Sequence, residues 1–168
     1  MKELFRSRAE HDAVVARLVD AVRTRGSRQL RLGKKTSNLF RQRAPHKGGR
    51  LEVEGLDRTI SVSPDGYADV QGMTTFEDFA DACLAHGFAP PVVPELKTIT
   101  IGGAATGIGV ESSSFRHGFV HESMEEMDIL CGDGEVRTCR PEGPNADLFH
   151  AFPNSYGTLG YAMRLRMA

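Results

Sequence analysis

The chain has no apolar stretch long enough to span a membrane, and its formal net charge of −1 gives it no overall attraction to nucleic acid or anionic lipid. Its first residues lead into an amphipathic helix rather than an apolar segment, so no secretory signal is visible and we expect a cytoplasmic protein. The three cysteines, Cys83, Cys131 and Cys139, lack Cys-x-x-Cys or Cys/His ligand spacing. We therefore expect buried thiols rather than disulfides, and no metal site.

Two common nucleotide-binding motifs are also absent. No Gly-Lys-Ser/Thr ends the glycine-rich segment at residues 96–118, which excludes the phosphate loop of nucleoside triphosphatases. A Gly-x-Gly-x-x-Gly fingerprint is missing too, because Gly107-Ile108-Gly109 is followed by Ser112 at the third position and by no helical periodicity. Neither a triphosphatase nor a doubly wound dinucleotide-binding domain is indicated.

The first part of the chain predicts one helix and three short strands. A length of 168 residues, with 40% apolar and 26% charged residues, suits one sizeable core or two small ones. Ser7 opens a capping box, and apolar residues then recur at helical intervals until Gly26. Alternating apolar residues predict strands at 30–32, 51–53 and 60–62.

The second part predicts two more helices and a closing strand. Thr74 opens another capping box, and Gly87 is placed to end the helix that follows. Asn145 is positioned to cap a short helix. Residues 161–167 alternate apolar and polar side chains, which predicts a half-buried strand.

A hairpin is expected between these elements, at residues 127–138. A two-residue loop at Asp133-Gly134 would place Cys131 opposite Val136. Such antiparallel pairing, together with the helices, argues against a purely parallel sheet and predicts an α+β fold.

The glycine-rich segment is the strongest functional signal. It follows an expected apolar strand, and its glycines allow a backbone to approach a ligand closely while its hydroxyls add donors. A loop of this composition suits a pyrophosphate, although a plain connection between strands is the other interpretation. The glycines are Gly102, Gly103, Gly107 and Gly109, and the hydroxyl residues are Thr100, Thr106, Ser112 and Ser113.

A basic stretch at residues 28–50 holds eight Lys or Arg residues and no acidic one. A solvated basic face and a phosphate-binding surface both remain open for it. A nucleic-acid surface is disfavoured, because Phe40 is the only stacking ring in the stretch and the remainder of the chain offsets its charge.

Three segments together resemble a known family. The glycine-rich segment is preceded by residues 91–96 (PVVPEL) and followed by residues 147–160 (DLFHAFPNSYGTLG). These segments resemble the FAD-binding domain of the vanillyl-alcohol oxidase and p-cresol methylhydroxylase (PCMH-type) flavoproteins, and within them the delta24-sterol reductase type. The resemblance implies two α+β lobes, at about residues 7–72 and 73–168, with FAD between them.

The resemblance also implies the cofactor-binding residues. Residues 100–112 resemble the segment along the pyrophosphate and ribityl chain, where backbone N–H groups of the glycines would be the main donors. Glu111 would point away or accept from ribose or backbone groups. Lysines beside Gly33 replace glycines of the wider family and would neutralise phosphate charge. The expected binding residues are Gly33, Lys34, Lys35, Thr36, Ser37, Thr100, Ile101, Gly102, Gly103, Ala104, Ala105, Thr106, Gly107, Ile108, Gly109, Val110, Glu111, Ser112, Ser113, Gly157 and Thr158.

We expect non-covalent FAD, because the first-lobe loop lacks the histidine that covalent family members use, and His46 and His117 are interpreted as surface residues. The resemblance implies hydride transfer at flavin N5, with NADPH as one candidate reductant and a small, sterol-like substrate held by a C-terminal cap domain that this chain lacks. Alone, the chain is expected to be inactive and to self-associate. Its sequence identifies no catalytic residue. A non-catalytic flavin-binding module, and the flavin domain of a lactone oxidase or UDP-N-acetylenolpyruvylglucosamine reductase, are the alternatives.

Overall fold

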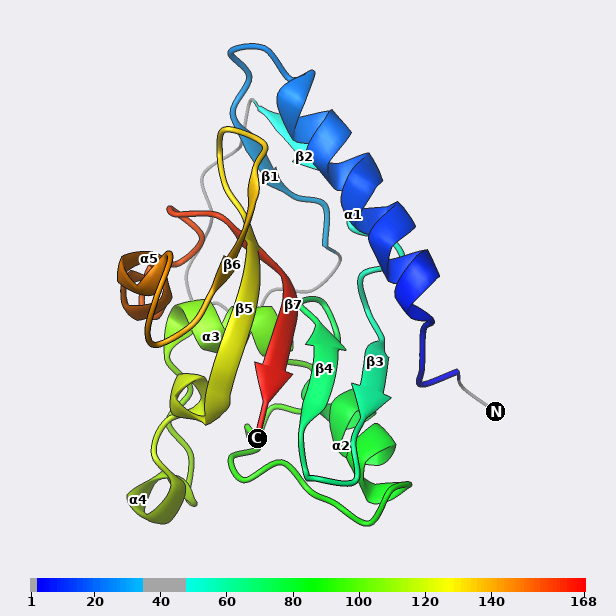
Figure 1. The fold of residues 1–168 in the computed structure, drawn as a ribbon, viewed down its shortest axis with the longest axis vertical. Helices are drawn as coiled ribbons and strands as arrows, with labels where there is room; N and C mark the ends of the chain where they lie inside the picture. Colours follow the sequence, from blue (N-terminus) through cyan, green and yellow to red (C-terminus); the bar gives the residue numbers. More distant parts are fainter. Residues whose placement is uncertain (1–2, 35–47) are drawn as a thin grey trace.

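The structure of the protein, a computed structural model, describes residues 3–34 and 48–168. It combines helices with antiparallel strands, so the predicted α+β class is confirmed (Figure 1). Within the described residues no helix is both long enough and apolar enough to cross a membrane. The helices are α1 (Arg8–Arg23), α2 (Phe76–Leu84), α3 (Ile101–Gly107), α4 (Ser114–His117) and α5 (Ala146–Ala151), with a 3-10 turn η1 (Val120–Ser123).

The strands form two sheets. A five-stranded antiparallel sheet has the order β3-β4-β7-β5-β6, and β1 pairs with β2 in a separate parallel pair. β4 pairs directly with β7, with Val70 opposite Leu165. The sheet therefore joins strands from both sides of residue 72, and the division into two lobes remains a prediction. The bounds are β1 Leu30–Leu32, β2 Gly49–Leu51, β3 Thr59–Val62, β4 Ala68–Gln71, β5 Met124–Leu130, β6 Val136–Cys139 and β7 Tyr161–Met167.

Two apolar clusters hold these layers together. The larger one packs α2 and α3 against the five-stranded sheet and includes Phe76, Ile101 and Leu165, all fully buried. The smaller one packs α1 against β2 and the upper end of the large sheet, where Leu18 and Met163 are fully buried (Figure 1). Burial of such side chains stabilises the fold by about 1.5–3 kcal/mol each.

Local capping explains where the first two helices begin. Ser7 caps α1 as predicted: its side chain accepts from the N–H of Glu10, whose carboxylate accepts from the N–H of Ser7. The cap of α2 was predicted one residue too early, because Thr75 rather than Thr74 accepts from the N–H of Asp78. Thr74 is instead fully buried.

The predicted hairpin is present, but its register was wrong by one residue. Leu130, not Cys131, lies opposite Val136. Gly134 adopts φ +82° and donates to the carbonyl of Cys131, while Cys131 donates to Glu135. The loop is therefore longer than the predicted two residues, and its left-handed glycine shifts every pair.

Helix α5 begins after Asn145, as expected, but the cap differs from the prediction. Asn145 has φ 62°, and its side chain donates to the carbonyl of Thr138 instead of capping the helix. The closing strand β7 is also present, but it is buried on both faces rather than half-buried. Its polar Arg164 is 5% exposed and lies among carboxylates of the neighbouring strands β4 and β5.

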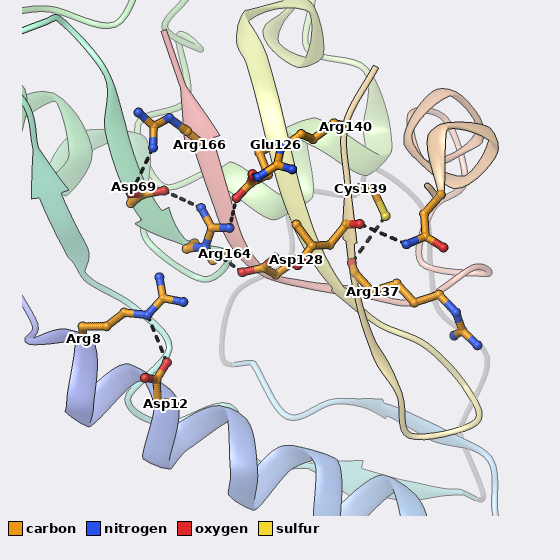
Figure 2. A network of polar contacts seen from close by, with 12 residues as sticks. Arg8, Asp12, Asp69, Glu126, Asp128, Arg137, Cys139, Arg140, Arg164 and Arg166 are labelled. Atoms are coloured by element: carbon orange, nitrogen blue, oxygen red, sulfur yellow. Dashed lines mark hydrogen bonds and ion pairs between the residues drawn. The ribbon is translucent and has the colours of Figure 1, made fainter. Parts of the chain in front are cut away.

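Arg164 joins the three central strands through ion pairs (Figure 2). Its guanidinium bonds Asp69 on β4 at 2.5 Å, Asp128 on β5 at 2.6 Å, and Glu126 on β5. Burial acts to lower the pKa of Arg164, but the hydrogen bonds from the carboxylates outweigh it and raise the pKa. The charge is therefore kept and satisfied inside the sheet.

Candidate functional site

The glycine-rich segment contains a helix where a loop was predicted. Residues 101–107 form α3, and the described segment directly before it is not a regular strand, since Thr100 makes only an isolated bridge with Thr75. Thr100 caps the helix by accepting from the N–H of Gly103 at 3.2 Å. Glycine disfavours helix by its own propensity, but burial of Ile101 and Ala105 in the core decides the conformation here.

The N–H groups at the start of α3 are engaged inside the protein. Ile101 donates to the carbonyl of Thr74, Gly102 donates to the carbonyl of Gly72, and Gly103 donates to the Thr100 hydroxyl. The N–H groups of Gly102 and Gly103 therefore already have acceptors within the protein.

Close packing explains why the chain has glycine at positions 72 and 102. A Cβ on Gly102 would lie 2.8 Å from the carbonyl oxygen of Gly72, and a Cβ on Gly72 would lie 2.1 Å from that of Ala162. Contacts between heavy atoms at such distances are repulsive. The two glycines let α3 lie directly against the ends of β4 and β7.

A cavity of about 220 Å³ opens beside the first turn of α3. We call it the α3 cleft. Its walls come from five separate parts of the chain: the end of β1, the connection between β2 and β3, the turn after β4, α3, and the turn leading into β7. The lining residues are Arg31, Leu32, Lys34, Leu56, Gly72, Met73, Thr100, Gly102, Gly103, Thr106, Tyr156, Gly157, Gly160, Tyr161 and Ala162.

Six of the sequence-predicted site residues line the α3 cleft. They are Lys34, Thr100, Gly102, Gly103, Thr106 and Gly157. Thr158 lines an adjoining cavity of about 260 Å³, which shares Gly157, Gly160 and Tyr161 with the cleft. The structure thus brings the glycine-rich segment, the first basic loop and the last predicted turn to one place.

Other predicted site residues do not line this cleft. Ile101, Ala104 and Ala105 are buried in the core. Gly33 donates to the carbonyl of Leu51 beside the β1–β2 pair. Lys35, Thr36, Ser37 and His46 lie outside the described residues. The cleft lining also omits Gly107, Ile108, Gly109, Val110, Glu111, Ser112 and Ser113.

Residues 108–113 lead from α3 to the single turn of α4. Gly109 is packed against Val120, so a Cβ there would lie 2.5 Å from the Val120 side chain. The Glu111 carboxylate accepts from the backbone N–H of Glu95 at 3.3 Å, which is one of the two arrangements expected for it. His117, at the end of α4, is exposed.

Sequence reasoning missed several residues of the cleft. Arg31 was marked only as part of the basic stretch at residues 28–50, Tyr161 was assigned to a strand, and no local pattern marked Met73. Tyr156 was part of the noted turn but was not singled out. Its backbone has φ 50°, and its N–H donates to the carbonyl of Thr106 at 3.1 Å.

The charge of the cleft suits an anion with a flat apolar part. Arg31 and Lys34 are cationic, and none of the described residues lining the cleft carries a carboxylate. Burial raises the pKa of Tyr161, and its phenol donates to the carbonyl of Leu30 at 3.2 Å. The described residues contain no group of three His, Cys, Asp or Glu placed to hold a metal ion.

Comparison with known proteins gives a consistent result. The family model described as "FAD binding domain" matches residues 6–140. Cytokinin dehydrogenase 9 from Oryza sativa subsp. japonica is 32% identical over 133 residues, which cover 77% of this chain and 25% of that protein. Delta(24)-sterol reductase is 41% identical in Rattus norvegicus and 33% identical in Homo sapiens, over 66% of this chain and 20% of each relative. The chain therefore spans about a fifth to a quarter of these relatives.

Proposed function

Because the chain belongs to the family of FAD binding domains, we propose that the α3 cleft and the adjoining cavity hold FAD without a covalent bond. The observation that carries the proposal is the convergence of two cations, a glycine-packed helix and two tyrosines on one cleft. A dinucleotide has the matching parts: a negative diphosphate and two flat ring systems. The domain lies within FAD-linked oxidoreductases, so the cofactor would supply redox chemistry through its flavin ring.

Different residues of the chain would bind different parts of FAD. Arg31 and Lys34 would neutralise the diphosphate, since guanidinium and ammonium groups form charge-assisted hydrogen bonds with phosphate oxygens. Gly72 and Gly102 would shape the floor of the cleft by letting α3 pack directly against the ends of β4 and β7. Lys35, Thr36 and Ser37 remain proposed ligands from the sequence, as do residues 107–113 and Thr158.

Non-covalent attachment is supported by the α3 cleft, whose described lining residues include no histidine or cysteine to form a bond to the flavin. The adjoining cavity is lined by one thiol, that of Cys131, so a peptide containing Cys131 belongs in the same test. Acid precipitation of the reconstituted protein should leave the flavin in the supernatant. A yellow pellet, or a flavin mass on a peptide with His46 or His117, would contradict this assignment.

We extend the proposal to an oxidoreductase that passes a hydride through flavin N5, with a small sterol-like substrate and NADPH as a candidate reductant. Names of the relatives support this reaction class: one set acts as cytokinin dehydrogenases and another as delta(24)-sterol reductases. Because the match covers only 20% to 25% of those proteins, the substrate contacts are proposed to come from sequence beyond the matched region. The domain alone is expected to bind flavin without substrate turnover.

A matched pair of arginine variants tests the location of the site. Arg31 lines the α3 cleft, whereas Arg28 belongs to the same basic stretch but is exposed and absent from the lining. Arg31→Ala should weaken FAD binding about tenfold and reduce its salt dependence, since a hydrogen bond to a charged group contributes about 1.5–3 kcal/mol. Arg28→Ala should leave affinity within about twofold. Equal effects of the two variants would place the diphosphate elsewhere.

A further inference from the structure

Tyr156 holds an unusual backbone conformation at the rim of the α3 cleft. Its φ of 50° lies in the left-handed region, which a bulky side chain rarely adopts. Asn154 and Gly157 beside it are also left-handed, with φ 61° and 82°, but asparagine and glycine tolerate this conformation well. Tyrosine does not, so the backbone at this position is strained.

Hydrogen bonds on both sides hold the backbone of Tyr156 in this strained conformation. The N–H of Tyr156 donates to the carbonyl of Thr106 on α3 at 3.1 Å, and the next turn is closed by Thr158 donating to Ser155. The turn therefore holds Tyr156 against α3, whatever side chain it carries.

The side chain itself contributes little to the core. Tyr156 is 60% exposed and belongs to neither apolar cluster. Its ring edge borders Gly107, because a Cβ on that glycine would lie 3.9 Å from Tyr156 Cε1. Glycine at 107 thus leaves the ring uncovered, on a residue that also lines the cleft. A strained, exposed aromatic side chain at a binding cleft is a pattern associated with ligand contact.

We propose that Tyr156 is a specificity-determining residue whose ring stacks on a flat heteroaromatic ring of the bound dinucleotide. The proposal rests on the proposed function of the cleft. Arg31 and Lys34 serve the phosphates, whereas an aromatic wall selects for a ring system, since offset or edge-to-face contact with a ring is favourable beyond its buried area. The flavin and the adenine of FAD share this chemistry.

Three variants of the intact chain separate ring contact from backbone strain. Tyr156→Gly removes the ring and the strain together, so it should unfold at a higher temperature than the parent and yet bind FAD about five- to tenfold more weakly. Tyr156→Ala should lose as much affinity without the gain in stability. Tyr156→Phe keeps the ring and should bind within about twofold of the parent. Phe115→Ala removes another exposed ring, which is 91% exposed on α4 and absent from the cleft lining, and should change nothing.

Titration calorimetry with FAD, FMN and ADP identifies the ring in contact. A loss shared by FAD and FMN assigns the contact to the flavin, and a loss shared by FAD and ADP assigns it to the adenine; either supports the proposal. If the parent binds FAD and Tyr156→Gly binds it equally well, the stacking role is overturned while the proposed function stands. If the parent binds none of the three, the proposed function itself fails.

Discussion

Gly72 and Ala162 lie so close together that a Cβ on Gly72 would be 2.1 Å from the carbonyl oxygen of Ala162. Gly72 ends the β4 region, donates to the carbonyl of Met163 at 3.2 Å and accepts from the N–H of Gly102 at 2.9 Å. It therefore joins β7 to α3 at the floor of the α3 cleft.

Gly72→Ala should destabilise the protein by about 1–3 kcal/mol or more, because a methyl group has to displace backbone rather than a flexible side chain. Chemical denaturation monitored by circular dichroism measures this change. Gly132→Ala is the matched control, since a Cβ there would come no closer than 3.9 Å to the side chain of Arg25. Equal stability of the two variants would mean that the strands separate easily at Gly72.

The same contact explains how far the sequence predicted the site. Helix α1 and strand β7 follow from local patterns, a capping box and a period of two, and both are present. The glycine-rich segment was read as a loop because glycine lowers helix propensity, whereas close packing of α3 on Gly72 and Ala162 depends on strands far away in sequence. Such a long-range contact leaves no local signal.

The predicted register of the hairpin was wrong and the predicted lining of the cleft was incomplete, for related reasons. A loop with Asp-Gly fits either a two-residue turn or a longer loop with a left-handed glycine, and only Gly134 in the folded chain decides between them. Tyr156 and Met73 reach the cleft from segments separated by half the chain. Periodicity describes one element at a time, so it does not show which turns meet.

Removing Arg164 should be strongly destabilising. Its guanidinium pairs with three largely buried carboxylates, on Asp69, Glu126 and Asp128 (Figure 2). Without it, Asp69 and Glu126 would keep only their more exposed partners Arg166 and Arg140, and Asp128 would lose its ion pair. Arg164→Met should therefore cost about 3–5 kcal/mol in the free energy of unfolding. Arg8→Ala breaks an exposed pair with Asp12, in which both side chains are more than half exposed, and should cost less than about 1 kcal/mol. A small effect of Arg164→Met in denaturant titrations would show that the three carboxylates are readily hydrated.

His11 predicts a loss of stability in mild acid. It is 2% exposed, and its Nδ1 lies 3.1 Å from Nε2 of Gln71. The Oε1 of Gln71 accepts from the N–H of Arg58, so Nε2 is the donor and His11 accepts as a neutral ring. Burial is the main cause that lowers the pKa of His11.

The charges around His11 do not reverse this direction. Arg8 and Arg164 lower its pKa and Asp12 and Asp128 raise it, but burial is the largest cause and the pKa of His11 stays lowered. Because the folded pKa lies below the unfolded value of about 6.5, the unfolded chain binds the proton more readily. The stabilising contribution of His11 is complete above that unfolded value and is lost as the pH falls toward and through the folded pKa.

Urea titrations between about pH 7.5 and about pH 5.5 measure this loss. His11→Asn keeps an acceptor near the position of Nδ1 but cannot be protonated in this range, so its stability should vary less with pH. An identical pH dependence in the parent and in His11→Asn would assign the acid sensitivity to other groups.

The central claim is that this domain holds a flavin dinucleotide through its diphosphate, and a direct comparison of FAD with FMN tests it. Titration calorimetry on the purified chain should give a dissociation constant for FAD at least about tenfold lower than for FMN, since a second phosphate and the adenosine add contacts beside Arg31 and Lys34. Equal affinity for the two flavins, or no binding of either, would contradict the account.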